Sequence, residues 1–113
     1  VGPEIITGST RMKAGTATKM VLNMISTATM IRLGKVYSNL MVDLMAVNEK
    51  LVDRGIRIIQ DFSNLDIENS HKILVAAKMS VKAAIVMVKK DCDLDVAKKL
   101  LLDANGFLRD VID

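Results

Sequence analysis

The chain has 113 residues, of which 50% are hydrophobic, 26% are charged and 3% are aromatic. This balance is typical of one folded domain with an aliphatic core, and it excludes a disordered or fibrous segment. With Cys92 as the single cysteine, no internal disulfide and no zinc-ligand cluster are expected, which favours a reducing, cytoplasmic setting. The 16 basic and 13 acidic residues are scattered, and aromatic side chains for base stacking are nearly absent, so nucleic acid is not an expected partner.

The longest uncharged apolar stretch runs from Met20 to Ile31 and is too short to span a bilayer, so no membrane contact is expected. The chain opens with Val-Gly-Pro and shows no signal-peptide pattern. We therefore expect it to be a piece of a longer protein.

The opening residues, 1–17, contain turn formers and are predicted to be a loop that ends at a helix start. From Met12 the apolar spacing becomes helical, and this helix is expected to be buried on most sides. Gly34 is expected to follow its end as a glycine cap. The residues that share the predicted helical face are Met20, Val21, Met24, Ile25, Ala28 and Ile31.

Residues 36–41 are predicted to form a turn or an extended link, and residues 42–62 a second long helix. Gly55 falls on the apolar stripe of that helix, where glycine costs about 1 kcal/mol relative to alanine. A close helix neighbour is the expected reason for this glycine. Polar residues at 63–66 end the pattern.

Three shorter helices are predicted at residues 67–78, 81–90 and 95–102, followed by a final turn or short helix at residues 107–112. Ser80 and Asp93 are the expected N-caps, and Asn105-Gly106 is a turn signal. No stretch alternates with the period of a strand. The predicted fold of the chain is therefore all-α, with two long helices followed by a small bundle.

The densest polar cluster is the opening loop, where hydroxyl groups at Thr7, Ser9 and Thr10 precede the helix start. Arg11 and Lys13 add positive charge where the helix dipole is also positive, and a bound anion such as a phosphate would relieve that mismatch. The alternative is that Ser9 or Thr10 caps the helix and that the two basic side chains are solvated.

Three runs of this sequence resemble a known family. The run GPEIITGSTRMKAGTATK resembles the signature of the N-acetylmuramic acid 6-phosphate etherases, which the glucokinase regulatory proteins share. The runs VLNMISTATMIRLGKVYSNLMVDLMAVNEKL and AAIVMVKKDCDLDVAKKLLLDANGFLRDVI are similar to the etherase branch. The resemblance covers essentially the whole chain and is much more specific than a short motif.

The resemblance implies the carboxy-terminal part of a bacterial cytoplasmic carbon–oxygen lyase of cell-wall recycling. Such enzymes are built on a sugar-isomerase-type (SIS) α/β domain, are usually homodimers, and need no metal or other cofactor. They cleave the D-lactyl ether of N-acetylmuramic acid 6-phosphate, giving N-acetylglucosamine 6-phosphate and D-lactate. The family's two acid–base glutamates lie in the amino-terminal half, so no catalytic residue is expected in this chain, which should be inactive alone.

The resemblance makes the opening loop the expected sugar-phosphate contact. The candidate substrate-binding residues are Glu4, Ser9, Thr10, Arg11 and Lys13. Glu4 is also a possible assisting carboxylate; its structural alternative is a loop carboxylate that pairs with Arg11 or Lys13. Lone His71 is expected to be structural or exposed, and the acids beside Cys92 argue against a reactive thiol.

The resemblance also predicts two domains. Residues 1–65 would be carboxy-terminal helices of the SIS domain with the substrate-loop signature, and residues 66–113 a small bundle similar to ubiquitin-associated domains. Two alternatives remain. One is a non-catalytic sugar-phosphate regulator resembling glucokinase regulatory protein, against which the short sequence after the signature counts. The other is a helical interaction module formed by residues 66–113.

Overall fold

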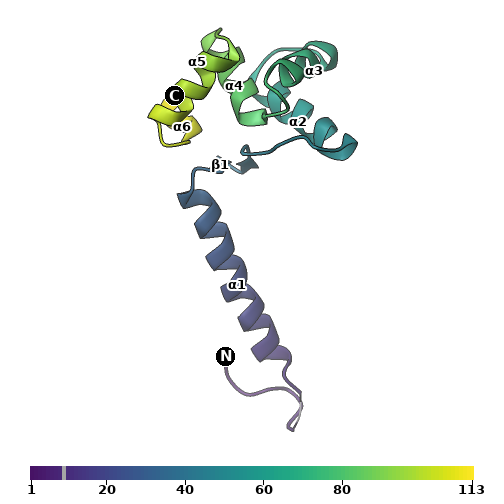
Figure 1. The fold of residues 1–113 in the computed structure, drawn as a ribbon. Helices are drawn as coiled ribbons and strands as arrows, with labels where there is room; N and C mark the ends of the chain where they lie inside the picture. The colour runs from purple at the N-terminus through teal and green to yellow at the C-terminus, as the bar shows by residue number, and fades with distance from the viewer. Residues whose placement is uncertain (9) are drawn as a thin grey trace. The chain divides into compact units, whose positions relative to one another are not determined.

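The computed structural model describes residues 1–8 and 10–113 and is mostly helical (Figure 1). Its elements form two compact units, Val1–Arg32 and Leu33–Asp113. The helices are α1 (Met12–Arg32), α2 (Glu49–Phe62), α3 (Ile67–Ala76), α4 (Val81–Lys90), α5 (Leu94–Asp103) and α6 (Leu108–Ile112), and the strands are β1 (Val36–Tyr37) and β2 (Leu40–Met41).

The division between the units falls after Arg32, so α2 lies in the second unit. In the structure, α2 packs against both α3 and α4. This packing places α2 in the same compact unit as the shorter helices.

The first unit consists of the opening loop and α1. Gly34, the second residue after α1, has a φ of +71°, as expected for a glycine that follows a helix end. No residue of α1 is buried among the described residues, so the expected burial on most sides is not found within this chain. Exposed large apolar side chains of α1 are Met12, Met20, Val21, Leu22, Met24, Ile25, Met30 and Ile31. They occur on every side of the helix, which is typical of a helix buried inside a larger protein.

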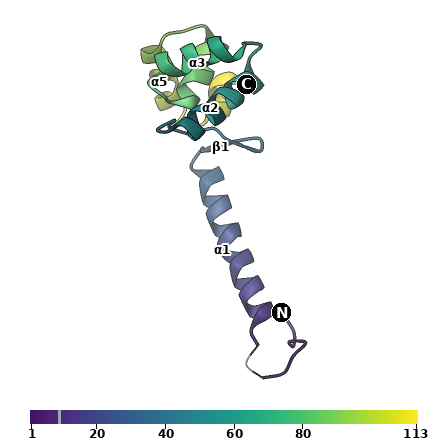
Figure 2. The ribbon, with the colours of Figure 1, turned by 90° about the vertical axis from the view of Figure 1, so that its right-hand side faces the viewer.

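The second unit opens with a short hairpin that departs from the all-α prediction. In the antiparallel pair β1 and β2, Val36 lies opposite Met41 and Tyr37 opposite Leu40. Figure 2 shows the hairpin at the edge of the helical bundle. Its turn contains Ser38 at a φ of +53°, a conformation that the apolar and polar pattern of residues 36–41 did not specify.

The prediction of one helix over residues 42–62 was wrong in its first third. Residues 42–48 are not helical, and α2 begins only after Asn48, whose side chain accepts a hydrogen bond from the Leu51 N–H at 2.9 Å. The main chain of this segment instead forms hydrogen bonds with the residues around the start of α4. Ala46 N–H donates to the Met79 carbonyl at 2.9 Å, and Val81 N–H donates to the Leu44 carbonyl at 3.0 Å.

Helix α4 is the centre of the bundle, with α2 and α3 packed on one side and α5 and α6 on the other (Figure 1). All six residues from Val81 to Val86 are buried. The predicted N-caps are confirmed: the side chains of Ser80 and Asp93 accept hydrogen bonds from the main-chain N–H groups of Ala83 and Val96. The Asn105-Gly106 turn is also confirmed, with both residues at positive φ.

Gly55 lies on the face of α2 that contacts α4 and α3. A Cβ atom built on Gly55 would lie 2.9 Å from Val81 Cγ2 and 3.4 Å from Leu74 Cδ2. The first distance is closer than carbon atoms tolerate, so the close helix neighbour predicted from the sequence is confirmed.

The hydroxyl of Ser70 is fully buried in α3 and has no hydrogen-bond partner among the described residues. Burial removes the hydrogen bonds that this hydroxyl makes to water in the unfolded chain, and no described group of the protein replaces them. We therefore expect Ser70→Ala to raise the free energy of unfolding by about 1 kcal/mol. Urea titration followed by circular dichroism measures this. The matched control is Ser63→Ala, which should be destabilising because the Ser63 hydroxyl donates to the Ile59 carbonyl at 2.8 Å. A Ser70→Ala chain less stable than the parent would contradict the prediction.

Candidate functional site

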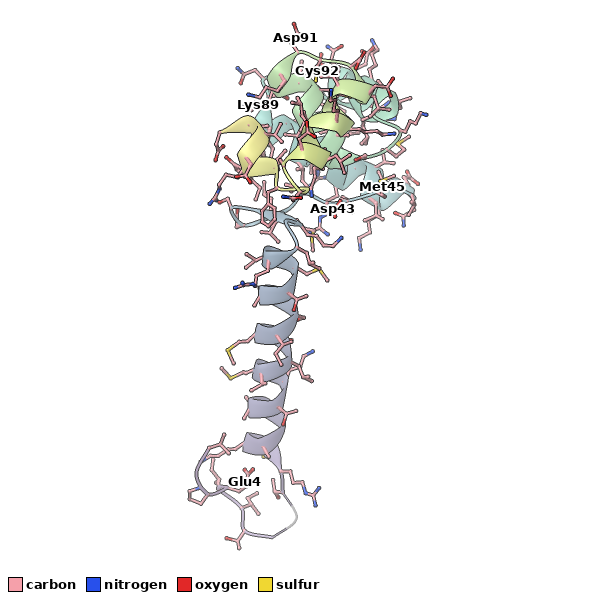
Figure 3. All side chains as sticks on the ribbon, turned by 60° about the vertical axis from the view of Figure 1, so that its left-hand side comes forward. Glu4, Asp43, Met45, Lys89, Asp91 and Cys92 are labelled. Atoms are coloured by element: carbon pink, nitrogen blue, oxygen red, sulfur yellow. The ribbon has the colours of Figure 1, made fainter. Side chains whose placement is uncertain are left out.

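The candidate site is the loop that precedes α1, and Glu4 is its organising residue. Figure 3 shows Glu4 beside the first turn of α1. Its Oε1 atom accepts a hydrogen bond from the main-chain N–H of Lys13 at 2.9 Å. Lys13 is the second residue of the helix, so this N–H is one of those that a helix start leaves without an internal partner. Glu4 therefore caps α1 by binding an N–H nine residues further along the chain.

The side chain of Lys13 closes the same loop from the other direction. Its Nζ donates to the Pro3 carbonyl at 2.6 Å, and the residue is half-buried. The loop is thus held to the helix by two contacts from one residue, its main-chain N–H to Glu4 and its ammonium to Pro3. The sequence offered Glu4 a pairing with Arg11 or Lys13; the contact in the structure is with the main-chain N–H of Lys13, and no ion pair found among the described residues involves Glu4.

The other candidate residues occupy the approach to the helix. Thr10 is half-buried and Arg11, directly before the first residue of α1, is exposed. Ser9 lies outside the described residues. A positive side chain at Arg11, the N–H groups of the first turn and the helix dipole together form an electropositive helix start. A carboxylate oxygen, that of Glu4, already accepts a hydrogen bond at this end of α1.

An open cleft of about 440 Å³ lies between the loop and the first turns of α1. Glu4, Lys13 and Thr16 supply its polar groups. Its apolar lining comes from Val1, Ile5, Met12, Ala17 and Met20. The electropositive helix start therefore adjoins a largely apolar wall.

Outside the loop and α1, the described residues include few cysteine and histidine side chains that could act as a nucleophile or a metal ligand. Burial raises the pKa of the Cys92 thiol, and the charges of Asp93 and Asp91 raise it further; Figure 3 shows Cys92 and Asp91 together at the turn after α4. A raised pKa is the direction expected from the neighbouring acids, and it disfavours the thiolate that a nucleophile needs. His71 is exposed. No group of three or more metal-ligating side chains occurs among the residues described, and none of the helices described is long and apolar enough to cross a membrane.

Curated proteins match this chain along its full length. It is 56% identical over 108 residues to the N-acetylmuramic acid 6-phosphate etherase of Oceanobacillus iheyensis, covering 96% of the chain and 37% of that protein. It is 54% identical over 113 residues to the etherase of Bacillus subtilis, and 50% identical over 113 residues to that of Salinibacter ruber. The last two matches cover all of this chain and 37% and 36% of those proteins, respectively.

The resemblance to N-acetylmuramic acid 6-phosphate etherases is confirmed. The chain corresponds to the carboxy-terminal region of these etherases and spans little more than a third of their length. No family model matches it. The run that resembles the etherase signature, residues 2–19, is the same segment in which Glu4 and Lys13 join the loop to α1.

The capping role of Glu4 is the feature of the site that sequence reasoning missed. Capping residues are expected immediately before a helix, and the sequence offered Ser9 and Thr10 there. A carboxylate so far upstream becomes a cap only because the loop turns back on α1. The sequence did contain a signal for this turn: Pro3 and Gly8, two residues typical of turns, lie at either end of residues 4–7.

Proposed function

We propose that this chain is the carboxy-terminal part of a carbon–oxygen lyase that cleaves the D-lactyl ether of N-acetylmuramic acid 6-phosphate. The observation that carries the proposal is identity of 50–56% to proteins of that name along 96–100% of the chain. Two of these matches cover the whole chain, including the signature and the helical bundle.

The proposed reaction is an elimination followed by an addition. A carboxylate base takes the proton beside the carbonyl of the opened sugar, the carbon–oxygen bond to lactate breaks, and the leaving oxygen receives a proton. Water then adds to the resulting double bond, giving N-acetylglucosamine 6-phosphate and D-lactate. Both acid–base carboxylates are proposed to lie in the remainder of the protein, so the main proposed contribution of this chain is substrate binding, with Glu4 as an assisting carboxylate.

The proposed contribution of this chain is the phosphate side of the substrate site. Arg11, with Ser9 and Thr10 beside it, would bind the sugar phosphate at the electropositive start of α1. Lys13 would act there through its charge while its ammonium holds Pro3. Glu4 is proposed to contact substrate or assist proton transfer through its carboxylate. Its hydrogen bond to Lys13 supports a second, positioning role, because that bond sets the course of the loop.

The exposed apolar sides of α1 support the proposed setting within a larger protein. The curated relatives are much longer than this chain, and a helix that is apolar all round needs cover on every side. We propose that a sugar-isomerase-type α/β domain supplies that cover, in a cytoplasmic homodimer. Residues 66–113, which contain α3 to α6, are proposed to be a structural appendage similar to ubiquitin-associated domains.

The deciding experiment measures D-lactate release from N-acetylmuramic acid 6-phosphate. The full-length parent enzyme should release D-lactate, and the 113-residue chain alone should release none, because the proposed acid–base carboxylates are absent from it. Release by the isolated chain would contradict the assignment of those groups to the rest of the protein. A parent that binds the sugar phosphate without turnover would instead be a regulator of the glucokinase regulatory protein type.

A further inference from the structure

Lys82 is a buried cation in the first turn of α4, and main-chain oxygens hold it. The residue is 7% exposed. Its Nζ donates hydrogen bonds to the Gly34 carbonyl at 2.8 Å and to the Gly106 carbonyl at 2.7 Å. In the part of the chain that the structure describes, no carboxylate lies within ion-pair distance of it. Because a buried ammonium must replace its lost water, these two carbonyls are what makes its burial tolerable.

The two carbonyls belong to glycine turns that touch one another. Gly34 and Gly106 have φ values of +71° and +80°, which side chains rarely adopt. A Cβ atom on Gly34 would lie 3.1 Å from the Gly106 oxygen and 3.3 Å from the Phe107 ring. Neither turn donates a main-chain hydrogen bond to the other among the bonds described; the Gly106 N–H donates to the Leu101 carbonyl at 2.7 Å. The Lys82 ammonium is therefore the group that bonds both turns.

The segment that Lys82 reaches is the connection from Leu33 to Asn48, which we call the entry segment. Its later part is held to the bundle by main-chain bonds, Ala46 N–H to the Met79 carbonyl and Val81 N–H to the Leu44 carbonyl. Those bonds lie well along the chain from Gly34. At the Gly34 end, the entry segment is held to the bundle by the side chain of Lys82, whose ammonium bonds the Gly34 carbonyl.

We propose that Lys82 is a lysine clamp that closes the beginning of the entry segment onto the bundle by joining the Gly34 turn to the Gly106 turn. The clamp acts through its N–H donors, so an unbranched apolar side chain without donors should release the segment. Release should be local, since the main-chain bonds near Ala46 do not involve Lys82.

The test is amide hydrogen exchange in the 113-residue chain carrying Lys82→Met, which retains an apolar stem but has no N–H. The reporters are the amides of Val42 and Asp43, because both donate to the Lys35 carbonyl next to Gly34. They should exchange about 10- to 100-fold faster, the scale of losing hydrogen bonds to a charged group. The matched control is Lys98→Met: Lys98 is exposed and lines the same 480 Å³ cleft as Lys82, and its loss should leave both rates unchanged.

A second variant keeps the proposal testable if Lys82→Met does not fold. Lys82→Ala leaves room for propylammonium, which carries the deleted carbons and the N–H donors. Added propylammonium should restore slow exchange at Val42 and Asp43, whereas trimethylpropylammonium, which has no N–H, should not. Wild-type exchange in Lys82→Met, or no recovery of Lys82→Ala with propylammonium, would overturn the clamp.

Discussion

Replacing Arg11 by alanine in the complete enzyme is expected to raise the Michaelis constant for N-acetylmuramic acid 6-phosphate by about 10- to 100-fold. A hydrogen bond to a charged group contributes about 1.5–3 kcal/mol, and its loss gives a change of this size. Arg11 is the exposed cation directly before α1, so its guanidinium is available to a phosphate at the helix start. Initial rates of D-lactate release over a range of substrate concentrations measure the effect.

Lys13→Ala and Lys19→Ala provide the comparisons for Arg11. Lys13→Ala should also raise the Michaelis constant, but part of its effect should be structural because the Lys13 ammonium holds Pro3. Lys19 is an exposed cation of the same helix beyond its first turn, so Lys19→Ala should leave the Michaelis constant unchanged. If neither Arg11→Ala nor Lys13→Ala changes the Michaelis constant, the phosphate assignment is wrong.

Alanine at Gly55 is expected to destabilise the second unit by about 1–3 kcal/mol, the usual cost of overpacking a close contact. The added methyl would collide with Val81 Cγ2 at 2.9 Å. This cost should exceed the helix propensity that alanine gains over glycine, about 1 kcal/mol. Urea unfolding of the 113-residue chain, followed by circular dichroism, gives the change in free energy.

Two controls separate packing from helix propensity. Gly15 in α1 has open space where a Cβ would lie, so Gly15→Ala should increase helix content without destabilising the chain. Removing the opposing methyl groups should relieve the collision, so Gly55→Ala combined with Val81→Ala should cost less than the sum of the two single changes. A stabilising effect of Gly55→Ala would refute the packing explanation.

Elements whose signals are local were predictable from the sequence. The side chains of Ser80 and Asp93 cap the helices that begin directly after them, and Asn105 with Gly106 forms a turn between adjacent elements. Each of these needs only residues within a few positions along the chain. The helical spacing after Met12 is local in the same sense, because it depends on one repeating face.

The beginning of α2 was not predictable in this way. Residues 42–48 carry enough apolar side chains to continue a helical pattern, and in isolation that pattern favours a helix. In the structure they are not helical, because Ala46 bonds to Met79 and Leu44 bonds to Val81, which lie far along the chain. Asn48 then provides the cap at which the helix begins.

The sequence by itself determined the etherase resemblance, the mostly helical content, the local caps and the loop that precedes α1. Tertiary structure alone decided which atoms meet: the Glu4 carboxylate with the Lys13 N–H nine residues on, and the Lys82 ammonium with carbonyls 48 and 24 residues away. The physical reason is the range of the interactions. Caps and turns are set by neighbouring torsion angles, whereas these contacts exist only after the chain has folded back and excluded water from the groups that it brings together.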